Sequence, residues 1–193
     1  LDSALTYLSD RTDEELKTNL EPLIQLHFAK NNFNQIIKYA NKLSDQYILN
    51  SKLVTKAYSN ENAWTSYRIG EAFYNTGDLP RAISYLKNAV RLAPFALDFK
   101  NKLGSALVSN NQIKEAEIQY TEVLKENPKH VSALTNLGFL RLNQGNVTEC
   151  EKLYLRTLSL DPDYEPLLLN LAGLSAYKKD FKKSQMYLER ILK

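Results

Sequence analysis

The sequence predicts an all-α fold of stacked antiparallel helix pairs, and three observations support this. Small residues recur at a fixed interval of 34 residues, as Gly70, Gly104 and Gly138 show. The segments between them place apolar residues three and four apart, which is the spacing of an amphipathic helix. Short runs of asparagine, glycine and aspartate separate these segments and act as helix breakers. A period of this length indicates an array of helical repeats.

The composition fits a folded domain and excludes several classes of protein. Of the 193 residues, 44% are hydrophobic and 24% are charged, and only 6 are glycine and 6 proline, unlike collagen or a linker. One cysteine cannot form an internal disulfide, and with two histidines it is too little for a His/Cys zinc site. No apolar run approaches the roughly 18 residues of a membrane span. A net charge of +3 with interspersed signs gives no strong attraction to nucleic acid or anionic lipid.

Residues 1–62 predict a degenerate helix pair that carries an insertion. Its two helices are expected over 20–30 and 31–43, where apolar residues keep the helical spacing. The distance to the next unit is 12 residues longer than the period requires. The apolar residues of 47–58 are therefore expected to lengthen a helix or to add one. A short helix is also expected over residues 1–10.

Four units then follow in phase, with bounds at 63–96, 97–130, 131–164 and 165–193, and the last is truncated or uncapped. A residue without bulk in each first helix lets it approach the second helix closely. Proline ends the second helix because it cannot continue the hydrogen-bond ladder. The recurring columns are Gly70, Gly104, Gly138 and Ala172; Ala82, Ala116, Cys150 and Ser184; and Pro94, Pro128 and Pro162.

The residue types in these columns resemble the tetratricopeptide repeat. The first unit contains Ile69-Gly70-Glu71-Ala72-Phe73, Gly77-Asp78, Ala82, Leu86, Ala89 and Pro94. The signature tryptophan position of the family is filled instead by Ser66, Lys100, Leu134 and Leu168. The resemblance covers roughly two thirds of the chain. It implies a right-handed α-solenoid superhelix whose first helices line a concave groove, where extended segments of partner proteins lie.

On the first helix of each unit, the apolar core columns leave one stripe of residues unused. This stripe forms the candidate partner-binding groove. Stacked repeats place equivalent residues side by side, so Arg68, Lys102, Asn136 and Asn170 would form a polar ladder. Asparagine amides both donate and accept, and can therefore bind a peptide main chain. A solvated helix face would carry the same column, so both interpretations stay open. The candidate groove residues are Tyr67, Arg68, Glu71, Tyr74, Asn101, Lys102, Ser105, Thr135, Asn136, Phe139, Asn143, Asn170 and Tyr177.

The sequence predicts no catalytic, cofactor or metal site. His27, His130 and Cys150 are far apart in the repeat layout. Cys150 stands in a column of alanine and serine, which predicts a buried filler, and His130 stands in a turn. No phosphate-binding loop or zinc spacing is present. The family's clamp for a terminal carboxylate needs cations on the third unit, where this chain has asparagine, so capture of a chaperone tail is not supported.

The expected function is a non-catalytic scaffold that binds another protein or a linear peptide in the groove, with no cofactor, no nucleic acid and no membrane insertion. One alternative is a regulatory or substrate-docking region of a larger protein or enzyme. Another is self-association through an apolar C-terminal face that lacks a polar cap. A cytoplasmic location is favoured. Because Leu1 is not a translational start, a periplasmic or secreted location stays open if a leader was removed before Leu1. The residues of the C-terminal face are Leu167, Leu168, Leu171, Leu174, Leu188, Ile191 and Leu192.

Overall fold

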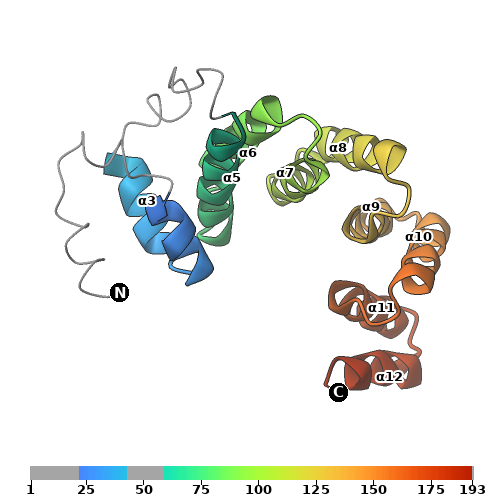
Figure 1. Ribbon diagram of the computed structural model, residues 1–193. Coiled ribbons are helices and arrows are strands. Elements are labelled where there is room, and N and C mark those ends of the chain that lie inside the picture. The colour runs from blue at the N-terminus through green and yellow to red at the C-terminus, as the bar shows by residue number, and fades with distance from the viewer. Residues whose placement is uncertain (1–21, 43–58, 193) are drawn as a thin grey trace. The chain divides into compact units, whose positions relative to one another are not determined.

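The computed structural model describes residues 22–42 and 59–192, and every regular element in these ranges is a helix. The predicted all-α fold class is thereby confirmed, as Figure 1 shows. The expected helices at 1–10 and 47–58 lie outside the described residues. The helices are one at 22–29, α3 (Phe33–Lys42), α5 (Ser59–Asn75), α6 (Leu79–Leu92), α7 (Leu97–Ser109), α8 (Ile113–Glu126), α9 (Val131–Asn143), α10 (Val147–Leu160), α11 (Glu165–Tyr177) and α12 (Phe181–Ile191).

The chain divides into two compact units, Leu1–Asn110 and Asn111–Lys193. In the first unit α5 packs against α3 and α6, and α7 packs against both α5 and α6. In the second unit α9 packs against α8 and α10, and α11 packs against α12. The turns at 76–78, 144–146 and 178–180 are short enough to hold their two helices antiparallel. Each such pair is called a hairpin below.

The short turns at 76–78, 110–112, 144–146 and 178–180 share one backbone feature. Their middle residues lie in the left-handed region, which glycine and asparagine tolerate best. The next residue caps the second helix: Asp78, Asn146 and Asp180 each accept a hydrogen bond from the backbone N–H three residues later. The breaker runs of the sequence thus end one helix and begin the next. The φ angles are 86° at Gly77, 59° at Asn111, 76° at Gly145 and 63° at Lys179.

The close approach predicted from the glycine column is confirmed at two positions. A Cβ added at Gly70 would lie 2.8 Å from Leu86 Cγ, 3.1 Å from the Leu86 backbone nitrogen and 3.2 Å from the Ala82 carbonyl oxygen. At Gly138 it would lie 2.5 Å from a ring carbon of Tyr154. Real Cβ atoms do not approach other atoms this closely in a close-packed interior. Glycine is therefore needed where the two helices of a hairpin touch.

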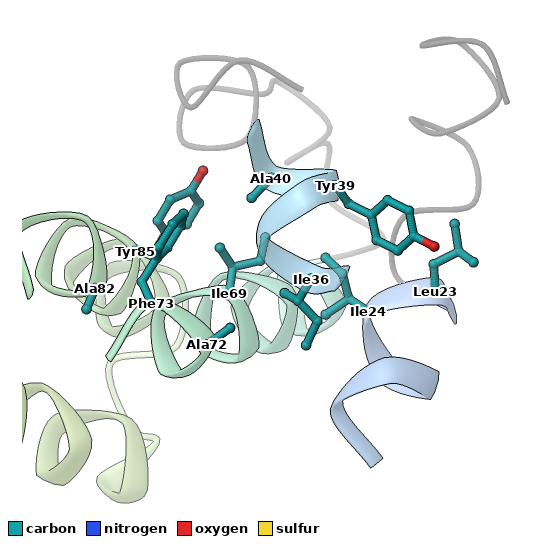
Figure 2. Packing of buried hydrophobic residues seen from close by; sticks show 10 residues of the cluster. All are labelled: Leu23, Ile24, Ile36, Tyr39, Ala40, Ile69, Ala72, Phe73, Ala82 and Tyr85. Atoms are coloured by element: carbon teal, nitrogen blue, oxygen red, sulfur yellow. The ribbon is translucent and has the colours of Figure 1, made fainter. Parts of the chain in front are cut away.

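The core of the first unit joins the N-terminal helices to α5 and α6. Figure 2 shows Ile24 and Ile36 gathered beside Ile69 of α5, and all three are fully buried. Phe73 stacks on Tyr85 with ring centroids 5.6 Å apart. This burial of large apolar side chains is the main source of stability for helices that would be marginal alone.

The core of the second unit contains Cys150, which is fully buried as predicted. It packs with Tyr154 of α10 and with leucines of α11, among them Leu167 and Leu171. Burial raises the pKa of the Cys150 thiol, which keeps it protonated and unreactive. The cysteine is thus a small apolar filler.

A buried polar pair lies where the signature of the tetratricopeptide repeat would place its tryptophan within residues 63–96. Ser66 is buried, and its Oγ accepts a 2.8 Å hydrogen bond from Asn88 Nδ2. Arg91 in turn donates to Asn88 Oδ1 at 2.7 Å. Because each polar group has a partner, its burial carries little penalty.

Candidate functional site

The predicted groove residues lie on α5, α7, α9 and α11, and they are divided between the two compact units. The α5–α7 face belongs to the first unit, and the α9–α11 face to the second. The α5–α7 face carries Tyr67, Arg68, Glu71, Tyr74, Asn101, Lys102 and Ser105. The α9–α11 face carries Asn136, Phe139, Asn143, Asn170 and Tyr177, and Thr135 stands on the same helix as the first three.

An ion pair joins the two helices of the α5–α7 face. Lys102 Nζ lies 2.6 Å from Glu71 Oε1 and 5.5 Å from the centre of the Tyr74 ring, a cation–π distance. Burial, and then the charge of Glu71 and its hydrogen bond, raise the pKa of the Tyr67 hydroxyl. The Tyr74 hydroxyl is 3.3 Å from Ser109 Oγ. The structure therefore brings four predicted residues together, with the two opposite charges paired.

Aromatic rings cover the N-terminal end of the α5–α7 face. Tyr67 stacks on Phe99 with centroids 4.6 Å apart, and Trp64 meets Phe99 edge-on at 4.8 Å. The Arg68 guanidinium lies 5.5 Å from the centre of the Trp64 ring. Trp64, Phe95 and Phe99 line an apolar pocket of about 480 Å³ in which Phe95 is 91% exposed. The sequence reasoning missed Phe95, although an aromatic directly after the turn proline was a visible signal.

Amides and exposed aromatics share the α9–α11 face. The helices α9 and α11 contact each other. Asn136 and Asn170 stand at equivalent positions on them and are both half-buried, whereas Phe139 is 40% exposed and Tyr177 74% exposed. Thr135 differs from its neighbours, because it is 1% exposed and its hydroxyl donates to the Val131 carbonyl at 3.0 Å. Its side chain belongs to the core and is not on the surface.

The groups that the sequence considered for catalysis lie in separate places. His27 is buried in the first unit beside Tyr39, with Nε2 3.2 Å from the tyrosine hydroxyl. His130 precedes α9, and its Nδ1 accepts a hydrogen bond from the Ala133 backbone N–H at 3.2 Å. Cys150 lies in the core of the second unit. Within residues 22–42 and 59–192, no three His, Cys, Asp or Glu side chains gather as metal ligands would.

The apolar C-terminal face is only partly exposed. Its α11 leucines, such as Leu167 and Leu174, are buried inside the second unit. On α12, Leu188 is 44% and Leu192 86% exposed, together with Phe181 at 69%. In the described part of the chain, no helix has the length and apolar character that a bilayer crossing requires.

Comparison with known proteins points to one family. A family model described as tetratricopeptide repeat matches residues 67–120 and 101–165, which together span half of the chain. The human protein O-mannosyl-transferase TMTC2 is 32% identical over 99 residues, which are 50% of this chain and 12% of that relative. This chain therefore spans about an eighth of the length of that protein.

Solved structures share the fold over most of the chain. MamA from Desulfovibrio magneticus RS-1 superposes with a TM-score of 0.65 and 18% identity, covering 91% of this chain and 93% of that one. YrrB, described as a TPR protein with an unusual peptide-binding site, gives a TM-score of 0.58 and 19% identity, covering 92% and 88%. At such identities the likeness speaks for the fold alone. The hairpins, their glycine contacts and the match of the family model over half of its residues together show that this chain belongs to the tetratricopeptide repeat family.

Proposed function

We propose that this chain is a protein-binding module that holds an extended segment of a partner on the face formed by α9 and α11, and that the chain itself performs no chemistry. Tetratricopeptide repeat proteins act in protein–protein interaction and peptide binding. The specific proposal here is the location: the α9–α11 face provides hydrogen bonds and apolar contact together, and the α5–α7 face provides an aromatic pocket.

The observation that carries the proposal is the composition of the α9–α11 face. Asn136 and Asn170 occupy the same position on two helices in contact. Each amide can donate to a partner's carbonyl and accept from its N–H, so the pair can follow a main chain without reading its side chains. Phe139 and Tyr177 are exposed beside them, and exposed rings add contact area at a low cost in conformational entropy.

The α5–α7 face, considered by itself, offers a place for one apolar side chain of a partner. Trp64 and Phe95 are 46% and 91% exposed around the 480 Å³ pocket. Aromatic residues that line a pocket are the usual anchors of protein interfaces. Glu71 and Lys102 pair with each other, so this face offers a partner little net charge. We therefore expect it to select for shape and apolar character.

Replacing both amides tests the proposal. Dodecapeptides are selected from a random display library against the wild-type chain, and their dissociation constants are measured by fluorescence anisotropy. We expect Asn136→Ala with Asn170→Ala to weaken the selected peptides about tenfold, because two hydrogen bonds of about 0.5–1.5 kcal/mol are lost. The thermal midpoint should change little, because both side chains are only half-buried and lie outside the hydrophobic core of the second unit.

A matched control removes two amides elsewhere. Asn34 on α3 and Gln185 on α12 are exposed and lie on second helices, so Asn34→Ala with Gln185→Ala should leave peptide affinity unchanged. Equal affinity of the wild type and the Asn136/Asn170 variant would remove the ladder hypothesis. Failure of every dodecapeptide to bind would contradict the whole proposal.

A second candidate function is a docking region inside a larger protein. The observation that favours it is the match to an O-mannosyl-transferase. The residues aligned with this chain make up only 12% of that protein. Sequencing the complete open reading frame that encodes these residues tests this role. A catalytic domain in the same frame would support docking, and a frame that codes only for helical repeats would contradict it.

A further inference from the structure

The C-terminal end of α11 and the turn that follows it combine several residues that are unfavourable for the local backbone. They are Gly173 inside α11, Lys179 in the turn and Lys182 in the first turn of α12. Natural sequences break local rules chiefly where function requires it.

Gly173 has no packing role. A Cβ added there would meet nothing within 4 Å, whereas at Gly70 and Gly138 it would collide with the paired helix. Glycine inside a helix is less stable than alanine because it loses more backbone entropy on folding. The residue leaves bare backbone at the surface between Leu169, 50% exposed, and Tyr177, 74% exposed. Bare backbone of this kind permits another chain to approach closely.

Lys179 occupies a position that suits glycine. Its φ is 63°, in the column that Gly77, Asn111 and Gly145 fill in the other turns. A side chain with a Cβ is strained in this left-handed conformation. Lys182 lies in the first turn of α12, where the free N–H groups carry partial positive charge and disfavour a cation.

Positive charge is concentrated in this turn. Residues 177–183 contain four lysines and one aspartate, a net charge of +3, which equals that of the whole chain. Lys178 forms an ion pair with Glu151, and Lys183 lies 3.4 Å from Asp180. Lys179 and Lys182 are exposed and have no ion-pair partner among the described residues. Two cations therefore remain to attract an acidic group.

We propose that the exposed side of α11 with the lysine turn 178–183 binds an acidic extended segment of a partner protein. The main chain of this segment passes over Gly173, an apolar side chain of the segment lies against Leu169 and Tyr177, and its carboxylates lie at Lys179 and Lys182. The inference rests on the proposed function and names the chemistry of the partner. Figure 1 shows α11 and α12 as the last hairpin of the chain.

The dimensions fit a short segment. Leu169 and Tyr177 are eight residues apart on α11, which is about 12 Å along the helix axis. An extended chain advances about 3.3 Å per residue, so about four residues cover this distance and two more reach the lysine turn. A bilayer or a nucleic acid would also be attracted by the lysines. Neither, however, gains from close approach to the backbone at Gly173 or from hydrogen bonds to the neighbouring Asn170 amide as a peptide main chain would. Complementarity to a peptide accounts for both features.

Two variants separate binding from stability. Both replace residues that are unfavourable for the local backbone, so each should stabilise the fold while it weakens binding. Gly173→Ala is expected to raise the thermal midpoint by about 2–4 °C and yet to weaken the tightest selected dodecapeptide about fivefold, because its Cβ occupies the path of the main chain. Lys179→Gly with Lys182→Ala relieves the strained turn and removes two charges. It is expected to weaken the same peptide about fivefold at about 0.1 M salt, and much less at about 1 M, where screening is strong.

A control variant and a neutral peptide complete the experiment. Lys114→Ala with Lys125→Ala removes two exposed lysines of α8 and should leave affinity unchanged. A peptide with Asn and Gln in place of Asp and Glu should bind the wild type as weakly as the acidic peptide binds the Lys179/Lys182 variant. Selected peptides without acidic residues would overturn the inference, and so would equal affinity for that variant.

Two further outcomes distinguish the possible failures. If Asn136→Ala with Asn170→Ala weakens the peptides while Lys179→Gly with Lys182→Ala does not, the proposed function stands and this inference fails. If only vesicles of phosphatidylcholine and phosphatidylserine respond to the lysines, the turn is a membrane contact and the inference is wrong. If no peptide binds at all, the proposed function fails and this inference fails with it.

Discussion

His27 shows how one buried polar residue makes folding depend on pH. It is 4% exposed, and its Nδ1 has no hydrogen-bond partner among the described residues. Burial, and secondarily the charge of Lys30, lower the pKa of His27 below its ordinary value. The sequence left open whether this histidine lies in the core, because imidazoles are found both in cores and on surfaces, whereas the structure places it on the buried face of its helix with Leu23 and Ile24. His130 was likewise expected in a solvated turn, whereas it caps α9.

The pH dependence of stability tests this environment. Because the pKa is lower in the folded state, the neutral form is favoured by folding, and its stabilisation is complete above the unfolded value of about 6.5. The free energy of unfolding should therefore fall as the pH drops from about 7.5 to about 5.5. Urea titrations across this range measure it.

A histidine-by-histidine comparison assigns the effect. His27→Gln should flatten the pH dependence, because glutamine does not titrate. His130→Asn keeps an acceptor at the N-cap of α9 and should preserve the dependence. The same slope in the His27→Gln variant would show that another group is responsible.

At the scale of elements, the recurring columns were sufficient to predict the helices and their tight contacts, because each column has a local physical cause. Glycine opens a close approach, proline stops a helix, and asparagine or aspartate caps the next one. The periodicity contains no comparable signal for the exposure or function of residues outside these columns. Thr135 stands in the same stripe as Asn136, but it is buried, and Phe95 lies outside every apolar column but lines the aromatic pocket. The candidate site was therefore predicted less completely than the fold.

Gly70→Ala is the sharpest test of the hairpin contact. Its Cβ would lie 3.1 Å and 3.2 Å from backbone atoms of α6, which cannot move as a side-chain tip can. We expect a loss of about 1–3 kcal/mol, since overpacking outweighs the gain of about 1 kcal/mol from the better helix former. Urea denaturation measures this loss of stability. Gly173→Ala is the matched control and is expected to stabilise the protein, because its Cβ would meet nothing within 4 Å. Equal shifts for the two variants would show that helix propensity alone is being measured.

At the scale of the whole molecule, the 34-residue interval also sets contacts between hairpins within the second unit. Arg156 donates to the Pro128 carbonyl at 2.7 Å, and Arg190 donates to the Pro162 carbonyl and to Asp163. Both arginines thus tie a second helix to the turn before its own hairpin. Arg156 and Arg190 are 34 residues apart in the sequence. The apolar pattern could not identify this pair, because charged residues on the outer helices do not contribute to it.

Removing these arginines should show equivalent effects at both places. We expect Arg156→Ala and Arg190→Ala each to lower the free energy of unfolding by about 0.5–1 kcal/mol, since the bonds are charge-assisted but exposed. The double variant should lose the sum, because the two sites share no partner. Lys152→Ala on α10, whose ion pair with Glu149 is 3.7 Å long, is the control and should change stability by less. A loss at only one arginine would contradict the equivalence.

The position of Trp64 gives the protein its own optical reporter. It is the single tryptophan of the chain, it is 46% exposed, and it lies edge-on to Phe99 with Arg68 above its ring. A side chain that enters the neighbouring pocket displaces water from the indole and shifts its emission to shorter wavelength. A ligand confined to the α9–α11 face leaves that spectrum as it was. Unlabelled titrations can therefore tell which half of the chain a partner has reached.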